Sequence, residues 1–400
     1  MKSRYDVVII GGGLAGSALG QTLASNGIDT LIVERETRFR DRVRGEQLQP
    51  WGVAEARRLG VLERLRRTCG HDQPFFDIHL GEASFGHRDL RATTPQGEPG
   101  LNFYHPEMQE SLLEAAEEAG AEVRRGAALR DLWTNGSVQL TLDRDGRSEE
   151  VKTSLVVGAD GRSSGVRKFA GFQVRRDPPF LRIAGVLADD VRTDENAAVV
   201  HMNPAAAHSA AIFPQGNGRA RLYAIYPEES GVRLQGERDL PRFVEELAVA
   251  GVPNEILSGL RFSGPLASFD GADVWVEHPS RSGAILIGDA AAANDPAWGQ
   301  GLALSLMDAR VLSDALLETD NWDEAGDVYA REHAQYYRVI HEVNRAMSEM
   351  FLRAGSTADA RRARALPKIA EDPTRIPDHF FAGPDLPWNA EVKARFLAED

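Results

Sequence analysis

The sequence predicts an α/β fold that combines a mostly parallel sheet, an inserted antiparallel β-sheet and helices towards the C-terminus. Three observations support this prediction. An apolar run at residues 5–10 is followed at once by glycines and a helical pattern. Short, alternating, glycine-punctuated runs fill residues 178–276, as is typical of antiparallel strands. Amphipathic segments at residues 302–317 and 323–352 then indicate long helices.

The first elements form a strand, helix and strand in sequence. Residues 5–10 consist of the apolar side chains that a strand buried on both faces requires. Residues 15–26 carry helix formers, and Gly27 follows at the position where helices commonly end. A second strand is predicted at Thr30–Glu34. This order over so short a stretch predicts parallel strands joined by a crossover helix.

Further segments complete the two predicted sheets. A helix begins at Pro106 and ends before Gly120, since proline is favoured in the first helical turn. The Asp145-Gly146 pair predicts a tight hairpin turn. We expect a proline-rich tail at residues 367–388 to wrap the surface. The remaining predicted elements are strands at 138–142, 154–157 and 284–287 and a helix near 240–250.

The composition indicates a globular protein that acts on a small molecule. Sixty acidic against 46 basic residues give a net charge of −14, which argues against nucleic acid or an anionic membrane as a partner. Cys69 is the only cysteine, so a disulfide, a CxxC redox pair and a cysteine zinc cluster are excluded. No metal site is predicted. The first residues lead into a strand rather than a signal peptide, and we therefore expect a cytoplasmic protein.

A glycine-rich motif lies between the first strand and the first helix. In Gly11-Gly12-Gly13-Leu14-Ala15-Gly16, the first glycine permits a tight turn, the third lets a pyrophosphate approach the backbone, and the last lets helix and strand pack closely. Glu34 ends the next strand and is placed to accept hydrogen bonds from a ribose diol. The motif predicts a Rossmann-type dinucleotide site; the alternative is a turn that serves packing alone.

Two later motifs follow apolar strands. Asp160-Gly161 comes after LVVGA, and Gly288-Asp289 comes after AILI and leads to the PAWGQG segment at residues 296–301. Open α/β sheets bind ligands at the carboxyl ends of their strands, so both aspartates are placed near a ligand. Residues 299–302 begin a helix, so their backbone N–H groups can face an anion, such as the edge of a reduced flavin. For Asp160-Gly161 the alternative is a turn required only by local geometry.

With these motifs in this order, the sequence resembles the group A flavin-dependent monooxygenases, the para-hydroxybenzoate hydroxylase-like FAD-binding family. The resemblance covers nearly the whole chain and implies FAD as cofactor, with the ADG segment near both FAD and NAD(P)H and the GD segment on the ribityl chain. The motifs and the resemblance together assign cofactor contacts to Gly11, Gly13, Leu14, Ala15, Gly16, Glu34, Arg35, Arg44, His105, Asp160, Gly161, Gly288, Asp289, Pro296, Gly299, Gln300, Gly301 and Leu302.

The same resemblance divides the chain. Residues 1–71, 105–177 and 281–400 are expected to form the FAD-binding domain with the C-terminal helices, and residues 72–104 and 178–280 the substrate-binding sheet. The chain departs from many members in three places. His105 stands where they have Arg or Gln, Ala292 where they have His, and Ala303 where they have Asn. These departures predict a somewhat different or weaker mode of FAD binding.

Several residues are candidates for contact with a substrate or a second cofactor. Arg44 is expected to bind FAD or the phosphates of NADPH, or else to be solvated like its neighbouring arginines. His105 either contacts the flavin or ends the preceding strand. Trp298 is expected to wall the substrate or to serve packing. The inserted sheet offers His201, His208, Tyr223 and Tyr226 for catalysis and Arg219 and Arg221 for a carboxylate, although each of these is more often a surface residue. No catalytic base is assigned.

The resemblance implies a monooxygenase that hydroxylates an aromatic, phenolic or polycyclic molecule with NAD(P)H and O2 through a flavin C4a-hydroperoxide. There is no second GxGxxG, so NADPH or NADH must bind without a Rossmann domain of its own. The alternatives are a reductase or halogenase of the same fold and a non-catalytic flavin-binding homologue. No WxWxIP segment is present, which argues against the tryptophan halogenases. The apolar stripe at residues 324–352 fits a core or a dimer face, so we expect a monomer or homodimer.

Overall fold

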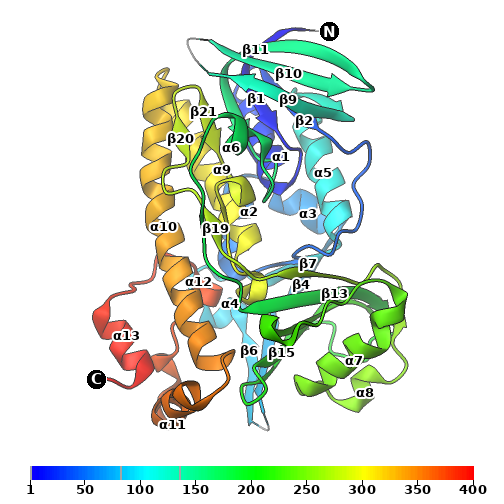
Figure 1. Cartoon of the computed structure of the whole chain (residues 1–400), viewed down its shortest axis with the longest axis vertical. Coiled ribbons are helices and arrows are strands. Elements are labelled where there is room, and N and C mark those ends of the chain that lie inside the picture. The colour runs from blue at the N-terminus through cyan, green and yellow to red at the C-terminus, as the bar shows by residue number, and fades with distance from the viewer. Residues whose placement is uncertain (1, 82, 135–136) are drawn as a thin grey trace.

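The computed structural model describes residues 2–81, 83–134 and 137–400 and confirms the predicted α/β fold class. A sheet that we call the parallel sheet occupies one end of the molecule (Figure 1). It has eight strands: a row of six, in which all neighbouring pairs run parallel except the edge pair formed by β20 and β21, and two further antiparallel strands that join this row at β11. In spatial order the strands of the row are β20 (Ser280–Arg281), β21 (Ala284–Leu286), β11 (Arg147–Gly158), β1 (Arg4–Ile10), β2 (Thr30–Glu34) and β8 (Glu122–Arg125).

The parallel sheet is covered on both faces, which explains the continuous apolar run of β1. Val7 and Ile9 face a core shared with three helices, α1 (Leu14–Ser25), α5 (His105–Glu118) and α9 (Gly301–Glu318). Val8 and Ile10 face a second core. That core includes α6 (Gly165–Phe169) and the antiparallel strands β9 (Ala127–Trp133) and β10 (Val138–Arg144), the latter paired with the first half of β11.

The predicted Asp-Gly hairpin connects β10 to β11. Asp145 and Gly146 have φ values of 52° and 76°, and Arg144 pairs with Arg147 across the turn. Two residues with positive φ form the two-residue turn whose twist matches that of the flanking strands. The local sequence signal was sufficient here because the turn itself sets the register.

A second eight-stranded sheet, the inserted sheet, lies at the other end of the molecule (Figure 1). It is not wholly antiparallel as predicted, because β14 and β5 pair in parallel. These two strands come from segments far apart in the chain, so no hairpin joins them. The strands are β17 (Arg261–Phe262), β13 (Leu181–Asp189), β16 (Arg219–Pro227), β15 (His208–Gly216), β14 (Ala197–Asn203), β5 (Phe75–Leu80) and β6 (Ala83–Asp89), with β18 (Ala267–Asp270) beside β13.

The inserted sheet is built from both segments predicted for the substrate-binding part, with β5 and β6 from the first and β13–β18 from the second. The division into two domains stays a prediction. The outer face of the inserted sheet carries α7 (Leu240–Val249), which packs on it through Phe243 and Leu247. Two small sheets lie between the large ones. They contain β3 (Gln47–Leu48), β7 (Gly100–Phe103) and β4 (Gly70–Gln73), and β12 (Arg175–Arg176), β19 (Val274–Trp275) and β22 (Ala292–Ala293).

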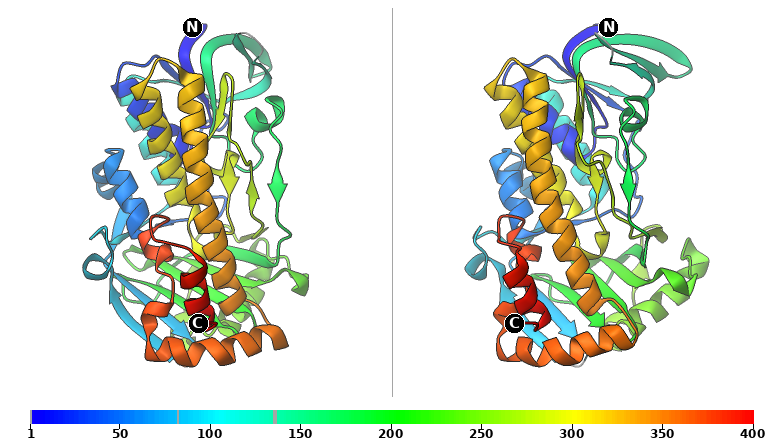
Figure 2. Two further views of the ribbon diagram at one scale, coloured as in Figure 1. Left: turned by 90° about the vertical axis from the view of Figure 1, so that its left-hand side faces the viewer. Right: turned by 60° about the vertical axis from the view of Figure 1, so that its left-hand side comes forward.

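The long helix α10 (Trp322–Phe351) runs alongside both ends of the molecule (Figure 2). Its first half packs on the core of the parallel sheet through Tyr329 and Tyr336, and its second half joins the core of the inserted sheet through Met347 and Phe351. Within the described residues, no helix has the length and apolarity needed to cross a membrane. The shorter helices are α2 (Pro50–Arg58), α3 (Leu62–Thr68), α4 (Leu90–Thr93) and α8 (Asn254–Leu257).

The expectation that residues 367–388 wrap the surface is wrong in part. Pro367 lies inside α11 (Ser356–Glu371), and the chain then enters α12 (His379–Ala382) before α13 (Ala390–Leu397). Phe381 of α12 is buried and packs edge-on against Phe76 of β5, with ring centroids 4.9 Å apart. The aromatic pair after the prolines supplies enough apolar surface to bring this segment into the core.

Candidate active site

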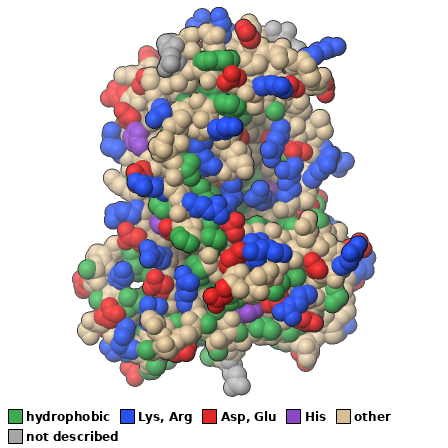
Figure 3. All heavy atoms as spheres, in the orientation of Figure 1, with side chains coloured by type: hydrophobic (Ala, Val, Ile, Leu, Met, Phe, Trp, Pro, Cys, Tyr) green, Lys and Arg blue, Asp and Glu red, His purple; other side chains and the backbone are tan. Residues whose placement is uncertain are grey.

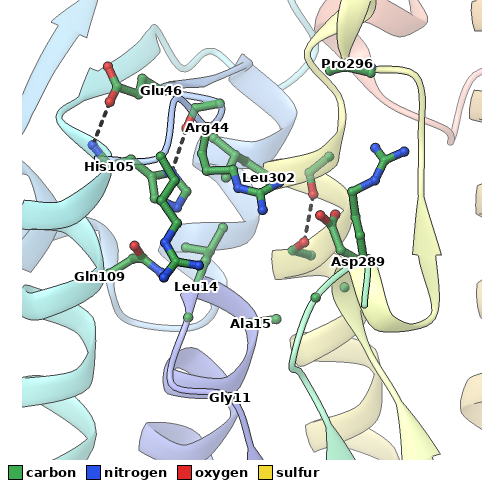
Figure 4. Close-up of a pocket in the computed structure, with 18 of the residues that line it drawn as sticks. Gly11, Leu14, Ala15, Arg44, Glu46, His105, Gln109, Asp289, Pro296 and Leu302 are labelled. Atoms are coloured by element: carbon green, nitrogen blue, oxygen red, sulfur yellow. Dashed lines mark hydrogen bonds between the residues drawn. The ribbon is translucent and has the colours of Figure 1, made fainter. Parts of the chain in front are cut away.

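A cavity of about 540 Å³ lies where the carboxyl ends of the parallel strands approach the inserted sheet (Figure 4). This volume is within the usual range for a small-molecule site. The three motifs and the inserted sheet all contribute to its wall. Of the predicted cofactor residues, every one lines the cavity except Gly16 and Gln300.

The glycine motif forms a turn with room for a phosphate. Gly11 has a φ of +107°, and a Cβ added to it would lie 2.3 Å from the carbonyl oxygen of Ala159. A Cβ at Gly16 would lie 2.0 Å from the carbonyl oxygen of Gly11, so Gly16 serves close packing. Gly13 precedes α1 without a side-chain cap, and its Cβ would meet only Gln109 Nε2, at 3.6 Å. The first N–H groups of α1 are therefore available to an anion.

Glu34 lies at the end of β2 and is held by backbone groups. One carboxylate oxygen accepts from the Gly12 N–H at 2.8 Å, and the other accepts from the Glu36 N–H, also at 2.8 Å. Each oxygen can still accept another hydrogen bond. The carboxylate is thus fixed beside the glycine turn, where a ribose diol would lie. The neighbouring Arg35 is exposed and also lines the cavity.

Arg44, His105 and Gln109 form the wall opposite Asp289 (Figure 4). His105 does not end the preceding strand; it begins α5, and its Nδ1 lies 2.8 Å from the Gly45 carbonyl oxygen. Burial lowers the pKa of His105 to about 4, and the charge of Arg44 acts in the same direction. The imidazole is therefore neutral near pH 7.

The sequence reasoning missed Gln109. It follows His105 by one helical turn on α5, and its side chain points into the cavity beside Arg44 (Figure 4). Residues i and i+4 share a helix face, so Gln109 brings an amide to the same wall as His105. Many family members have Arg or Gln at the position of His105. The spacing from His105 was the one signal in the sequence that could have identified Gln109.

Asp160 lines the cavity and also fixes the local turn, while its contact with a cofactor stays a prediction. Its Oδ2 accepts from the N–H groups of Gly165 at 2.6 Å and Val166 at 3.3 Å, so it caps α6. Its Oδ1 is buried and has no partner among the described residues. Burial raises the pKa of Asp160. Gly161, with a φ of +79°, completes the turn. Asp160 as a residue lines the cavity, but its Oδ1 is enclosed by protein atoms.

Asp289 follows β21 in a short 3-10 turn, η3 (Gly288–Ala290), and points into the cavity (Figure 4). Its carboxylate makes no hydrogen bond within the described part of the chain. Burial raises the pKa of Asp289, while Arg44 and Arg162 oppose this shift. Asp308 on α9 holds the η3 turn in place, because its Oδ2 accepts a hydrogen bond from the Gly288 N–H at 2.7 Å. A rigid turn that presents an unpaired carboxylate fits a ribityl hydroxyl.

In the PAWGQG segment the backbone faces the cavity, whereas the Gln300 side chain makes its hydrogen bonds elsewhere. Gly299, Gly301 and Leu302 line the cavity at the start of α9, which has no side-chain cap. Gln300 is fully buried, accepts from Trp51 Nε1 at 2.9 Å and donates to the Trp298 carbonyl oxygen at 2.7 Å. Its side chain therefore positions the loop and does not reach the cavity. Ala303 faces α2, where it lies against Gly52.

The inserted sheet contributes an apolar face to the same cavity. Strand alternation selects that face, because Tyr223 and Ile225 of β16 line the cavity whereas Leu222 and Ala224 pack towards α7. The other cavity residues at this end are Ile183, Val200, Ser209, Ala211, Phe213, Phe269, Asn294, Pro296, Ala297, Trp298 and Phe380.

His201, His208 and Tyr226 lie outside the cavity. His208 Nε2 lies 2.7 Å from Glu246 Oε2 on α7, and His201 stacks on His79 with ring centroids 4.6 Å apart. Tyr226 is buried in the core beneath α7. All three have the strand parity that points away from the cavity, which argues against them as substrate contacts.

Tyr223 and Trp298 do line the cavity, but their polar atoms are already used. The Tyr223 hydroxyl donates to the carbonyl oxygen of Arg44, and burial raises the pKa of Tyr223 well above its ordinary value. Trp298 Nε1 donates to Ser348 Oγ at 2.7 Å. Both residues can therefore act as walls, and Tyr223 is unsuited to remove a proton at neutral pH.

The two arginines considered for a substrate carboxylate already pair with acidic side chains of the protein. Arg221 is fully buried, and its Nε and Nη2 each donate to Glu46 at 2.8 Å while Nη2 also donates to Asp41 at 2.7 Å. Burial opposes the charge, but the hydrogen bonds to Glu46 outweigh it and raise the pKa of Arg221. Arg219 is exposed and pairs with Asp189.

These features fit FAD. The glycine turn leaves space and free N–H groups for a pyrophosphate, Glu34 is placed for a ribose, and Asp289 presents a carboxylate with no hydrogen-bond partner among the described residues. A group that extends from the turn past Asp289 arrives at the start of α9, beside the apolar sheet face.

Comparison with known proteins agrees with this fit. The family model described as "FAD binding domain" matches residues 4–339. The chain is 27% identical to digeranylgeranylglycerophospholipid reductase of Methanosarcina mazei, covering 82% of this chain and 78% of that protein. It is also 27% identical to 6-methylpretetramide 4-monooxygenase of Streptomyces rimosus, covering 92% and 89%. The crystal structure of p-nitrophenol 4-monooxygenase PnpA from Pseudomonas putida superimposes with a TM-score of 0.77 at 18% identity, covering 100% and 98%.

Proposed function

Because the chain belongs to the FAD-binding domain family of the group A flavin-dependent monooxygenases, we propose that it hydroxylates an aromatic small molecule with NAD(P)H and O2. One observation carries the proposal: the cofactor cradle and an apolar, water-excluding sheet face share a single cavity. The similarity to 6-methylpretetramide 4-monooxygenase supports a phenolic or polycyclic substrate.

Bound FAD supplies the redox chemistry and the activation of O2. This chain's residues hold it through the α1 N-terminus and Glu34 at one end and through Asp289 and the α9 N-terminus at the other. Arg44 and Gln109 close the remaining side. Backbone N–H groups at a helix start stabilise negative charge on the flavin ring without reorganising.

The substrate would lie against Phe213, Ile225 and Trp298. These side chains exclude water and orient a ring beside the start of α9, which raises the effective concentration of the reacting groups. None of them carries a proton to transfer. Tyr223 keeps its hydroxyl on the Arg44 carbonyl oxygen, so this chain offers no ionised base at the ring.

NAD(P)H would approach from the open side of the cavity. Arg35, Arg40 and Arg42 are exposed, line the cavity and offer cations for phosphates. Figure 3 shows basic side chains over much of this face, including the level where the two ends of the molecule meet. We further propose a cytoplasmic monomer or homodimer with no nucleic-acid or membrane partner, consistent with the net charge of −14.

The test is an anaerobic titration of the FAD-loaded protein with NADPH and then NADH, following the absorbance of oxidised flavin with and without a panel of phenols. Rapid bleaching, followed by O2 consumption with substrate, is the expected result. If neither nucleotide bleaches the flavin while dithionite does, a self-sufficient monooxygenase is excluded. Free FAD under the same conditions controls for non-enzymatic reduction.

The second candidate function is an FAD-dependent reductase. Two observations favour it: the similarity to digeranylgeranylglycerophospholipid reductase and the lack of a titratable base on the apolar face within the described residues. A reductase would turn over substrate without consuming O2, whereas a halogenase would require halide in addition to O2. Turnover of any kind would exclude a non-catalytic flavin-binding homologue.

A further inference from the structure

A second cavity, of about 330 Å³, lies between the β12–β19 pair and the second half of α10. Among the described residues, it shares no lining residue with the first cavity. Three of its side chains, Asp177, Asp273 and His341, bring one possible ligand atom each within 4.8 Å of one another. His341 Nε2 lies 2.9 Å from Asp177 Oδ2 and 3.9 Å from Asp273 Oδ2. We call these three residues the Asp-Asp-His cluster.

The spacing of these atoms is close to that of ligands on one ion. Ligands bound at right angles with bonds of about 2.1 Å lie about 3 Å apart, so small side-chain rotations would bring all three atoms onto one cation. The backbone holds the two carboxylates side by side, because the Asp177 N–H donates to the Asp273 carbonyl oxygen at 3.0 Å. The His341 ring lies against Trp275, with ring centroids 5.0 Å apart.

Two further polar side chains line this cavity although they are almost fully buried. Asn344, one helical turn after His341 on α10, is 6% exposed. Its Nδ2 is enclosed by protein atoms, whereas its Oδ1 is not enclosed and has no partner among the described residues. Asp295 is 3% exposed; its Oδ1 accepts from the Ala297 N–H at 2.9 Å, and its Oδ2 is likewise accessible and unpaired. The waters of a partly hydrated ion would donate to both oxygens.

The charge of the cluster also favours a cation. Burial raises the pKa of Asp273 to about 6, and the charge of Asp177 acts in the same direction. His341 and Arg162 oppose this shift, but Arg162 lies 3.5 Å from Asp270, with which it also pairs. Two neighbouring carboxylates with one imidazole therefore retain an excess of negative charge, which a divalent ion would compensate.

Two arginines line the same cavity without neutralising the cluster. Arg345 is largely exposed and lies 3.6 Å from Glu349. Arg353 follows the end of α10, and its guanidinium carbon lies 3.7 Å from the ring centroid of Phe180. The charge of Arg353 acts on Asp295. Neither arginine forms an ion pair with an aspartate of the cluster in the described part of the chain.

We propose that Asp177, Asp273 and His341 bind one divalent first-row transition-metal ion, Mn²⁺ or Zn²⁺, with Asn344 and Asp295 facing its waters. Carboxylate oxygens combined with an imidazole nitrogen suit these ions, whereas Mg²⁺ and Ca²⁺ prefer oxygen ligands alone. The three ligands come from segments far apart in the sequence, so no spacing motif marks the site there.

The ion would join α10 to the segment that leads into the wall of the first cavity. Asp273 Oδ1 accepts from the Asp295 N–H at 3.0 Å, and Asp295 caps the 3-10 turn η4 (Pro296–Trp298). All three residues of η4 line the first cavity. The inferred role is structural, because the ion takes part in no redox step, and it does not depend on the proposed hydroxylation.

The test is equilibrium dialysis of the FAD-loaded, EDTA-treated protein against MnCl2 at pH 7.5, with bound and free Mn²⁺ measured by electron paramagnetic resonance. We expect one bound ion per chain. A tenfold excess of MgCl2 should leave most of the Mn²⁺ bound, whereas ZnCl2 should displace it, since Zn²⁺ binds such ligands more tightly. Absence of stoichiometric binding would overturn the proposal, as would displacement by MgCl2.

Variants locate the bound ion. Asp177→Asn and His341→Gln should each weaken Mn²⁺ binding at least about tenfold. The matched control is an exposed pair of the same chemistry, in which His278 Nε2 lies 3.1 Å from Asp327 Oδ1. His278→Gln should leave binding unchanged. Binding that survives in both cluster variants, or that the control loses equally, would overturn the assignment.

Thermal melts provide a readout that requires no turnover. Because the ion binds the folded chain, Mn²⁺ at about one hundred times its Kd should raise Tm by at least about 3 °C. The same Mn²⁺ concentration should leave the Tm of Asp177→Asn nearly unchanged, and an equal rise in that variant would refute the site. The Asp177 side chain is 39% exposed, so this variant decides the question even if His341→Gln does not fold.

Discussion

Arg221 on β16 and Glu46 ahead of β3 form an ion pair in which both side chains are 0% exposed. The guanidinium donates through Nε and Nη2 to the two carboxylate oxygens, each at 2.8 Å. Glu46 also accepts from the His105 N–H at 3.0 Å. The pair therefore joins the inserted sheet to the loop that carries Arg44 and to the start of α5.

Glu46→Gln should lower the free energy of unfolding by about 3 kcal/mol, because a buried arginine would lose its main counter-ion. FAD affinity should fall as well, since the Arg44 loop would be released from the sheet. Urea denaturation of the apoprotein and a flavin-binding titration measure the two effects. Arg219→Gln removes an exposed ion pair and should cost less than about 1 kcal/mol. A loss for Glu46→Gln as small as that of the control would contradict the prediction.

Gly13→Ala should weaken FAD binding at least tenfold, or about 1.4 kcal/mol, while the apoprotein stays folded. The added methyl group meets only Gln109 Nε2, at 3.6 Å, yet it occupies the space where a phosphate approaches the α1 N-terminus. Flavin fluorescence quenching and the circular dichroism of the apoprotein test both statements.

Gly16→Ala is the matched comparison for that variant. Its Cβ would lie 2.0 Å from the Gly11 carbonyl oxygen, so the apoprotein itself should be destabilised. If both alanine variants lose stability to the same degree, Gly13 has no separate role towards the cofactor.

Asp289→Ala should weaken FAD binding by roughly 10- to 150-fold, the value of about 1.5–3 kcal/mol for a hydrogen bond to a charged group. Its carboxylate has no hydrogen-bond partner within the described residues, so its removal should leave apoprotein stability unchanged or slightly improved. Isothermal titration with FAD gives the affinity, and Asp320→Ala, at an exposed aspartate, provides the control. Unaltered affinity would remove Asp289 from the cofactor site.

Asp295 should make the protein less stable as the pH rises. Its side chain is buried, and burial raises its pKa to about 8, with the charge of Asp273 acting in the same direction. The unfolded chain releases this proton near pH 4, whereas the folded chain keeps it until about pH 8. Between these values the folded state binds more protons, so the free energy of unfolding falls with rising pH.

Asp295→Asn should remove much of this slope. The amide oxygen can still accept the Ala297 N–H that Asp295 Oδ1 accepts at 2.9 Å. We expect Tm at pH 8 to rise by at least about 3 °C, which corresponds to roughly 1 kcal/mol in a large domain. Thermal melts from pH 5 to 8.5 measure it, with Asp190→Asn as control. A parallel pH dependence of the variant and the unmodified protein would contradict the assignment.

The cofactor half of the site was predictable because its signals are local. The glycine turn, Glu34 and Asp289 each follow directly from a strand end, so the chain positions them without help from distant segments. Gln300 shows the limit of such motifs. Whether its side chain faces the cavity depends on Trp51, which lies 249 residues earlier and takes its amide oxygen.

The substrate half was not predictable, because one residue of strand register decides which side chains face the cavity. His201 and Val200 are neighbours on β14, yet only Val200 lines the cavity. Arg221 looked free in the sequence because its partner Glu46 lies 175 residues away. Phe380, which also lines the cavity, was missed because a proline-rich composition says nothing about where the aromatic residues between the prolines lie.

The parallel pairing of β5 with β14 affects how the protein emerges from the ribosome. Strand β5 is synthesised long before β14, so its hairpin with β6 leaves the exit tunnel with an open edge that has no partner yet. β1 likewise waits for β11, and the residues at 299–302 that complete the cofactor wall come later still. A nascent chain arrested before α9 therefore lacks part of the cofactor wall, and the complete wall can form only once α9 has been synthesised.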